Sequence, residues 1–122
     1  MSGVNLLLDT NIIIYAMKGL ASVRPYFAEA PFISVVTEME ILGVKDLTNT
    51  EIKIREAAID FCGIIPFSNK IKERAIAIKR LIKIPLADAI IAATCIEEDF
   101  TLVTADKGFK RIKELQLILI EV

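Results

Sequence analysis

Four acidic residues stand where strands are predicted to end or helices to begin. They are Asp9, Glu40, Asp88 and Asp106, spread over nearly the whole chain of 122 residues. Carboxylates packed together repel one another and raise each other's pKa values. A hard divalent cation such as Mg²⁺ or Mn²⁺ prefers oxygen ligands and relieves that repulsion. If the fold gathers these side chains, they can hold such an ion, which lowers the pKa of a bound water.

The sequence contains no histidine, the commonest general base and the commonest transition-metal ligand. Hydrolases built on Ser-His or Cys-His pairs are therefore excluded. The two cysteines, Cys62 and Cys95, give neither a disulfide framework nor zinc-site spacing, and we expect both to be small core residues. Hydrolytic chemistry in this chain must use carboxylates, lysines, hydroxyls or a hard metal ion.

Short apolar segments alternate with longer helical patterns along the chain. The predicted strands cover residues 4–8, 31–36, 64–67, 100–104 and 117–120. The predicted helices cover residues 12–17, 21–29, 37–44, 50–62, 70–83, 85–98 and 107–113. Pro66 indicates an edge position for the third strand. This alternation predicts an α/β fold, a three-layer sandwich whose helices cover both faces of a central, mostly parallel sheet of four to five strands.

The four acids are placed to meet at one edge of that sheet, because ligands of open α/β sheets bind beyond the carboxyl ends of the strands. Asp9 follows the first predicted strand directly, and Asp106 comes two residues after the fourth. Glu40 lies in the first turns of the helix after the second strand. Asp88 lies in the first turn of the helix that begins at Pro85.

Each acid also has a structural interpretation. Asp9 and Asp106 suit N-cap positions, and Asp88 suits the positive end of a helix dipole. Glu40 has the spacing of a capping box with Thr37. Composition and spacing alone leave the structural and the catalytic interpretations open.

Positive charge is concentrated in two segments of the chain. Residues 70–83 and 107–113 hold 10 of the 15 basic residues and 1 of the 16 acidic ones, so they sum to +9 and the remainder to −10. This asymmetry is typical either of a basic rim that holds phosphates or of two solvated helix faces.

Composition also limits the cellular location. No apolar run reaches the roughly 18 residues that a membrane span requires, and residues 1–5 carry no cationic segment of a signal peptide. With no disulfide framework, we expect a cytoplasmic protein without a membrane partner.

Four strings in the sequence resemble the motifs of the PIN-domain family, and more narrowly those of VapC-type toxins of prokaryotic toxin–antitoxin pairs. They are LLLDTN at 6–11, TEMEILG at 37–43, LADAIIAAT at 86–94 and LVTAD at 102–106. They occur in order along the whole chain. The resemblance implies a single PIN-like domain over residues 1–122, with a PIN-like α/β/α sandwich.

The resemblance also implies an activity, a cofactor and partners. It implies a cytoplasmic endoribonuclease that needs Mg²⁺ or Mn²⁺ and cuts RNA through a metal-activated water. It further implies a homodimer and a small VapB-like antitoxin. The acids that match the family's acidic positions are Asp9, Glu40, Asp88 and Asp106. Asn11 and Thr104 match positions that support the site through hydrogen bonds.

Two positions in or near these motifs, Glu38 and Gly108, bear on the match. Glu38 is also acidic, but the family's glutamate usually sits three residues after the threonine, which selects Glu40. Gly108 stands just before Phe109, where many relatives carry a second acid.

Three other functions are alternatives to a nuclease. A receiver-type phosphoacceptor domain needs an acidic pair after the first strand and an Asp after the third, but the sequence has a lone Asp9 and Ser68-Asn69. A phosphatase with an Asp-x-Asp nucleophile would need an acid at Asn11. The remaining alternative is a non-catalytic PIN-like module that binds RNA or a protein.

Overall fold

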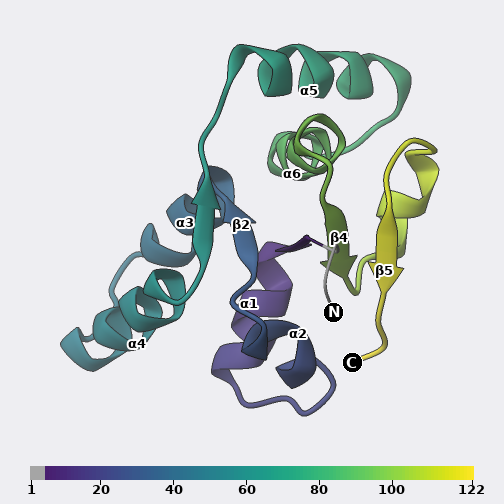
Figure 1. The fold of residues 1–122 in the computed structure, drawn as a ribbon. Coiled ribbons are helices and arrows are strands. Elements are labelled where there is room, and N and C mark those ends of the chain that lie inside the picture. Colours follow the sequence, from purple (N-terminus) through teal and green to yellow (C-terminus); the bar gives the residue numbers. More distant parts are fainter. Residues whose placement is uncertain (1–4) are drawn as a thin grey trace.

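The computed structural model describes residues 5–122, in which helices alternate with short strands (Figure 1). The strands are β1 (Leu6–Leu8), β2 (Phe32–Ser34), β3 (Gly63–Ile65), β4 (Thr101–Thr104) and β5 (Leu117–Leu119). They form a five-stranded sheet in the order β3-β2-β1-β4-β5, and every neighbouring pair is parallel. The predicted α/β fold with a parallel sheet is therefore confirmed. The predicted start of the first strand, Val4, lies outside the described residues.

The helices cover both faces of this sheet. They are α1 (Thr10–Met17), α2 (Arg24–Ala28), α3 (Val35–Leu42), α4 (Asn49–Asp60), α5 (Asn69–Leu81), α6 (Leu86–Glu98) and the 3₁₀ helix η1 (Lys107–Arg111). One apolar core lies between the sheet and α5, α6 and η1, and the other between the sheet and α1 to α4. This arrangement is the expected three-layer sandwich.

Strand β1 is buried from both sides because successive side chains of a strand point to opposite faces. Leu7 belongs to the core under α5 and α6, and Leu8 belongs to the core under α1 to α4. Strand β4 repeats the pattern with Leu102 and Val103. Continuous apolar runs of this kind are typical of parallel strands that are covered on both faces.

Helix α6 is buried over much of its length, in keeping with its largely apolar sequence. Its fully buried residues are Ala89, Ile91, Ala92, Ala93, Thr94 and Cys95. Helix α5 packs against it through the buried stripe of Ile71, Ala75 and Ile78. The next apolar residue on this face, Ile82, is the C-cap of α5 and is only partly buried.

The boundary between β2 and α3 was predicted wrongly. Residues Val35 and Val36 were assigned to the strand because β-branched residues favour strands. In the structure they begin α3, because the Ser34 side chain caps this helix by accepting a hydrogen bond from the Val36 N–H at 3.1 Å. Thr37 therefore lies inside the helix, and its predicted capping box with Glu40 does not form.

Smaller differences concern other element ends. The first helix begins at Thr10, since Asp9 is its N-cap, and the second begins only at Arg24. Strand β3 ends at Ile65, before Pro66, which has no N–H to donate. It lies at the edge of the sheet as predicted. The helix predicted at 107–113 is the shorter 3₁₀ helix η1.

Strand order decides which residues can meet. Strand β1 lies between β2 and β4, so the segments that follow these three strands share the carboxyl edge of the sheet.

Among the described residues, no helix is both long and apolar enough to cross a membrane.

Candidate active site

Asp9 is the most buried of the four acids, with 4% of its surface exposed. It directly follows β1, and its backbone N–H continues the sheet by donating to the Val103 carbonyl at 3.0 Å. One carboxylate oxygen, Oδ1, accepts the Thr10 N–H at 2.8 Å, and Oδ2 accepts the Thr104 hydroxyl at 2.7 Å. Asp9 thus acts as the N-cap of α1 and is also held at the carboxyl edge of the sheet.

Thr104 links two of the acids. Its buried hydroxyl donates to Asp9 and accepts the backbone N–H of Asp106 at 3.0 Å. Asp106 in turn caps η1, because its Oδ1 accepts the Gly108 N–H at 2.8 Å. The predicted structural roles of Asp9 and Asp106 as caps are therefore real, and they coexist with a shared location beside Thr104.

Glu40 reaches the same edge from α3. Its Oε1 accepts the Thr10 hydroxyl at 2.6 Å, and the Thr10 and Thr37 hydroxyl oxygens are 2.9 Å apart. Thr10 has a single hydroxyl proton, which goes to Glu40, so Thr37 donates to Thr10. Sequence reasoning missed Thr10 as the partner of Glu40 and Thr37 as the partner of Thr10. The available signal was that both lie inside the motif strings at 6–11 and 37–43.

Asp88 lies in the first turn of α6 and is half-buried. Its pKa is raised to about 6, first by burial and then by the negative charges of Asp9, Asp106 and Glu40. The pKa of Asp9 is also raised, first by burial and then by the charges of Asp106 and Glu40, against the lowering effect of its bonds from Thr104 and Thr10. The four predicted acids therefore interact electrostatically with one another.

Whether the site suits a divalent cation depends on its donors. Within residues 5–122, no three Cys, Asp or Glu side chains converge into a preformed metal-binding cluster. The donors present are nevertheless carboxylate oxygens, which Mg²⁺ and Mn²⁺ prefer. The ion pairs of the described residues join Arg74 to Glu97 and Glu114, and none involves the four acids. Their negative charge thus lacks a protein cation, and the donor set fits a divalent ion.

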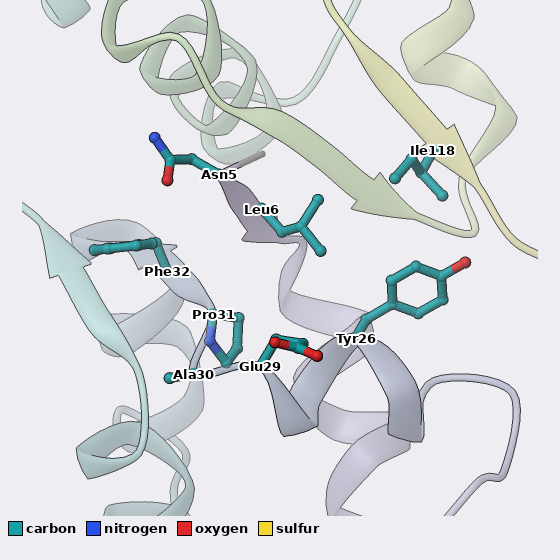
Figure 2. A pocket seen from close by; sticks show the side chains of 8 residues that line it. All are labelled: Asn5, Leu6, Tyr26, Glu29, Ala30, Pro31, Phe32 and Ile118. Atoms are coloured by element: carbon teal, nitrogen blue, oxygen red, sulfur yellow. The ribbon is translucent and has the colours of Figure 1, made fainter. Parts of the chain in front are cut away.

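A small pocket of about 110 Å³ opens between two of the acids. Its lining residues are Ile84, Pro85, Asp88, Asp106, Gly108, Phe109 and Arg111. A larger pocket, of about 310 Å³, lies where β1 and β2 begin, lined by residues such as Asn5 and Tyr26 (Figure 2). The acids lie at the carboxyl edge of the sheet, beyond the strand ends. Of these two pockets, only the smaller one lies at that edge.

Two further residues have different surroundings. Asn11 was predicted to support the site, but its side chain is exposed and forms no hydrogen bond with the other described residues. Glu38 is partly buried on α3, and its charge does not affect the pKa of Asp9 or Asp88. Glu40 is therefore the glutamate of this segment that lies in the electrostatic field of the other acids.

Comparison with known proteins identifies the family. The PIN domain family model matches residues 6–115, which include all four acids. The chain belongs to the PIN domain family. This PIN domain has no significant match among curated proteins.

Solved structures share the fold of this PIN domain over nearly its full length. A toxin–antitoxin complex from Klebsiella pneumoniae is 29% identical, with 97% of this chain and 100% of that chain covered and a TM-score of 0.81. VapBC2 from Rickettsia felis, bound to a promoter DNA fragment, is 27% identical, with 95% and 98% covered and a TM-score of 0.77. The fold also matches DNA-bound VapBC from Salmonella typhimurium, at 20% identity, 94% and 97% coverage and a TM-score of 0.84. The chain therefore has the fold of proteins that were solved in toxin–antitoxin complexes.

Proposed function

We propose that this PIN-domain protein is a Mg²⁺- or Mn²⁺-dependent endoribonuclease, the VapC-like toxin of a type II toxin–antitoxin pair. The observation that carries the proposal is the mutual electrostatic effect of Asp9, Glu40, Asp88 and Asp106, which no protein cation offsets. Burial and the neighbouring charges disfavour the ionised forms of Asp9 and Asp88, so the presence of these acids is best explained by a ligand of opposite charge.

The residues have separable roles. Asp9, Asp88 and Asp106 would hold the ion, with Asp9 kept in place by Thr104 and by the N-terminus of α1. When bound, Mg²⁺ or Mn²⁺ would lower the pKa of water and neutralise negative charge on the phosphate. Glu40, fixed by the Thr10 hydroxyl, would complete the acidic cluster and orient the attacking water. In-line attack would leave a 5′-phosphate and a 3′-hydroxyl on the RNA.

The relatives suggest the partners. Structural neighbours that cover at least 95% of the chain are toxin–antitoxin complexes, so we propose a small VapB-like antitoxin for this chain, together with a cytoplasmic homodimer. The RNA substrate would meet the basic segments 70–83 and 107–113, whose contacts with phosphates should weaken as salt increases.

A cleavage assay tests the activity. A mixed RNA is incubated with the wild-type protein in Mg²⁺, in Mn²⁺ and in EDTA, and with the Asp9→Asn and Glu38→Gln variants in Mg²⁺. We expect cleavage by the wild type with either ion and by Glu38→Gln, and none in EDTA or by Asp9→Asn. Equal products in all reactions would exclude the metal-dependent site. Absence of cleavage together with RNA binding would instead favour a non-catalytic binding module.

A further inference from the structure

Arg111 lines the same small pocket as Asp88 and Asp106. Two hydrogen bonds to backbone carbonyls fix its guanidinium. Nε donates to the Gly108 carbonyl at 3.0 Å, and Nη1 donates to the Lys83 carbonyl at 2.8 Å. One bond lies within η1 and the other reaches the segment before α6, so the plane of the guanidinium is set by two separate parts of the fold.

This guanidinium does not neutralise the acids beside it. No ion pair within 4.0 Å joins Arg111 to Asp88 or Asp106, and its Nη2 forms no hydrogen bond with other residues in 5–122. An arginine close to two carboxylates ordinarily pairs with one of them. Here the carbonyls hold it away from them, and its remaining donors are available to a ligand.

Gly108 keeps the space between the two charges open. A Cβ at this position would lie 3.0 Å from Oδ1 of Asp106 and 3.5 Å from Nη2 of Arg111. Any larger side chain would therefore extend into the gap between the carboxylate and the guanidinium. The glycine leaves a pocket that has carboxylates on one side and fixed N–H donors on the other.

A phosphodiester group suits such a pocket. Its oxygens accept hydrogen bonds from a planar guanidinium, and its charge can share a divalent cation with the opposing carboxylates. We propose that Arg111 binds a backbone phosphate of the RNA substrate next to the cleaved bond. This inference rests on the proposed nuclease function and adds a phosphate-binding residue to it.

Binding of an uncut RNA tests the assignment without relying on activity. Fluorescence anisotropy measures the affinity of a labelled single-stranded RNA in Mg²⁺ for three proteins: Asp9→Asn alone, Asp9→Asn with Arg111→Gln, and Asp9→Asn with Lys53→Gln. Lys53 is an exposed cation of α4 and controls for the loss of one positive charge. We expect Arg111→Gln to weaken binding about tenfold. The slope of log affinity against log salt should become shallower by about 0.7, which corresponds to one phosphate contact. Lys53→Gln should change neither.

Thermal unfolding of the same proteins separates a structural role from phosphate binding. If Arg111→Gln lowers the melting temperature but leaves the salt slope equal to that of Lys53→Gln, Arg111 only ties η1 to the rest of the fold and the proposal is overturned. Failure of the Asp9→Asn protein to bind RNA would overturn it as well. Cleavage by the wild type with an unchanged slope for Arg111→Gln would leave the nuclease function standing and remove only this inference.

Discussion

The Thr104 hydroxyl donates a 2.7 Å hydrogen bond to Oδ2 of Asp9, although 95 residues separate the two in sequence. Both residues lie at the carboxyl ends of adjacent strands, Asp9 after β1 and Thr104 as the last residue of β4. The bond stabilises the ionised form of a carboxylate whose burial otherwise favours its protonated form. The contribution of Thr104 to stability should therefore depend on whether the Asp9 carboxyl group is ionised.

Replacing Thr104 should cost stability in a pH-dependent way. Thr104→Val leaves Oδ2 of Asp9 and the Asp106 N–H without their partner, which should lower the free energy of unfolding by about 1–3 kcal/mol at pH 8. The deficit should shrink as the pH falls and Asp9 becomes protonated, because the lost bond mainly stabilised the carboxylate. Urea unfolding at several pH values measures it. Thr104→Ser keeps the hydroxyl and should behave like the wild type, and a deficit independent of pH would contradict this role.

Thr10 should matter for the rate of cleavage. Thr10→Val keeps the side chain's shape but removes the hydroxyl that donates to Glu40. If Glu40 orients the attacking water, kcat should fall about tenfold, equivalent to about 1.4 kcal/mol, while KM for RNA changes little. Thr10→Ser should restore the rate. A rise in KM with unchanged kcat would show that the hydroxyl supports RNA binding instead.

Thr37 should act on Glu40 only through Thr10. Its buried hydroxyl is 2.9 Å from that of Thr10 and has no direct bond to the glutamate. Thr37→Val should therefore lower kcat less than Thr10→Val, and the double variant should be no slower than Thr10→Val alone. Cleavage rates of the three proteins at saturating RNA measure this, and fully additive losses would show that the two hydroxyls act independently.

In the metal-free protein, the ionised Asp88 should lower the free energy of unfolding at neutral pH relative to an uncharged residue at this position. Its pKa of about 6 exceeds the ordinary value of 3.8, so the folded chain binds this proton more tightly than the unfolded chain. The resulting stabilisation is fully present below about pH 4 and is lost as the pH rises through about 6. Asp88→Asn in EDTA should therefore be more stable than the wild type at pH 8, by roughly 1 kcal/mol after solvent screening. Melting temperatures that differ equally at pH 4 and pH 8 would contradict this explanation.

The edge of the sheet should be sensitive to a methyl group at Gly63. A Cβ there would lie 2.6 Å from two ring carbons of Phe32, whose ring packs against that of Phe100 with centroids 5.0 Å apart. Gly63→Ala should therefore lower the free energy of unfolding by about 1–3 kcal/mol. Chemical unfolding measures the loss, and adding Phe32→Leu should recover part of it by removing the clash. A neutral Gly63→Ala would show that the ring moves aside without cost.

The layers of the fold could be predicted from the sequence, because apolar runs and helical periodicity are local properties. The apolar run at β1 and the apolar helix α6 were assigned correctly for this reason. The start of α3 was not, because Val35 and Val36 favour a strand and only the cap at Ser34 makes them helical. A local cap had a larger effect than intrinsic propensity at this boundary.

The shared location of the four acids at the carboxyl edge of the sheet was predictable, but their connections were not. The motif strings selected Asp9, Glu40, Asp88 and Asp106, and the structure gives them mutual electrostatic effects. The bonds from Thr10 to Glu40 and from Arg111 to Lys83 join residues 30 and 28 positions apart. Their formation depends on strand order and on the packing of α6 and η1, which no local pattern encodes.

A titration with Mn²⁺ tests whether the acids at the carboxyl edge of the sheet share one divalent cation. Calorimetry compares the wild type with Asp9→Asn, Asp88→Asn and Glu38→Gln, the last being an acid of α3 outside the cluster. We expect one class of sites in the wild type and in Glu38→Gln. Either of the other substitutions should weaken Mn²⁺ binding at least tenfold, since each removes a charged oxygen donor. Equal Mn²⁺ affinities for all four proteins would contradict a shared cation site.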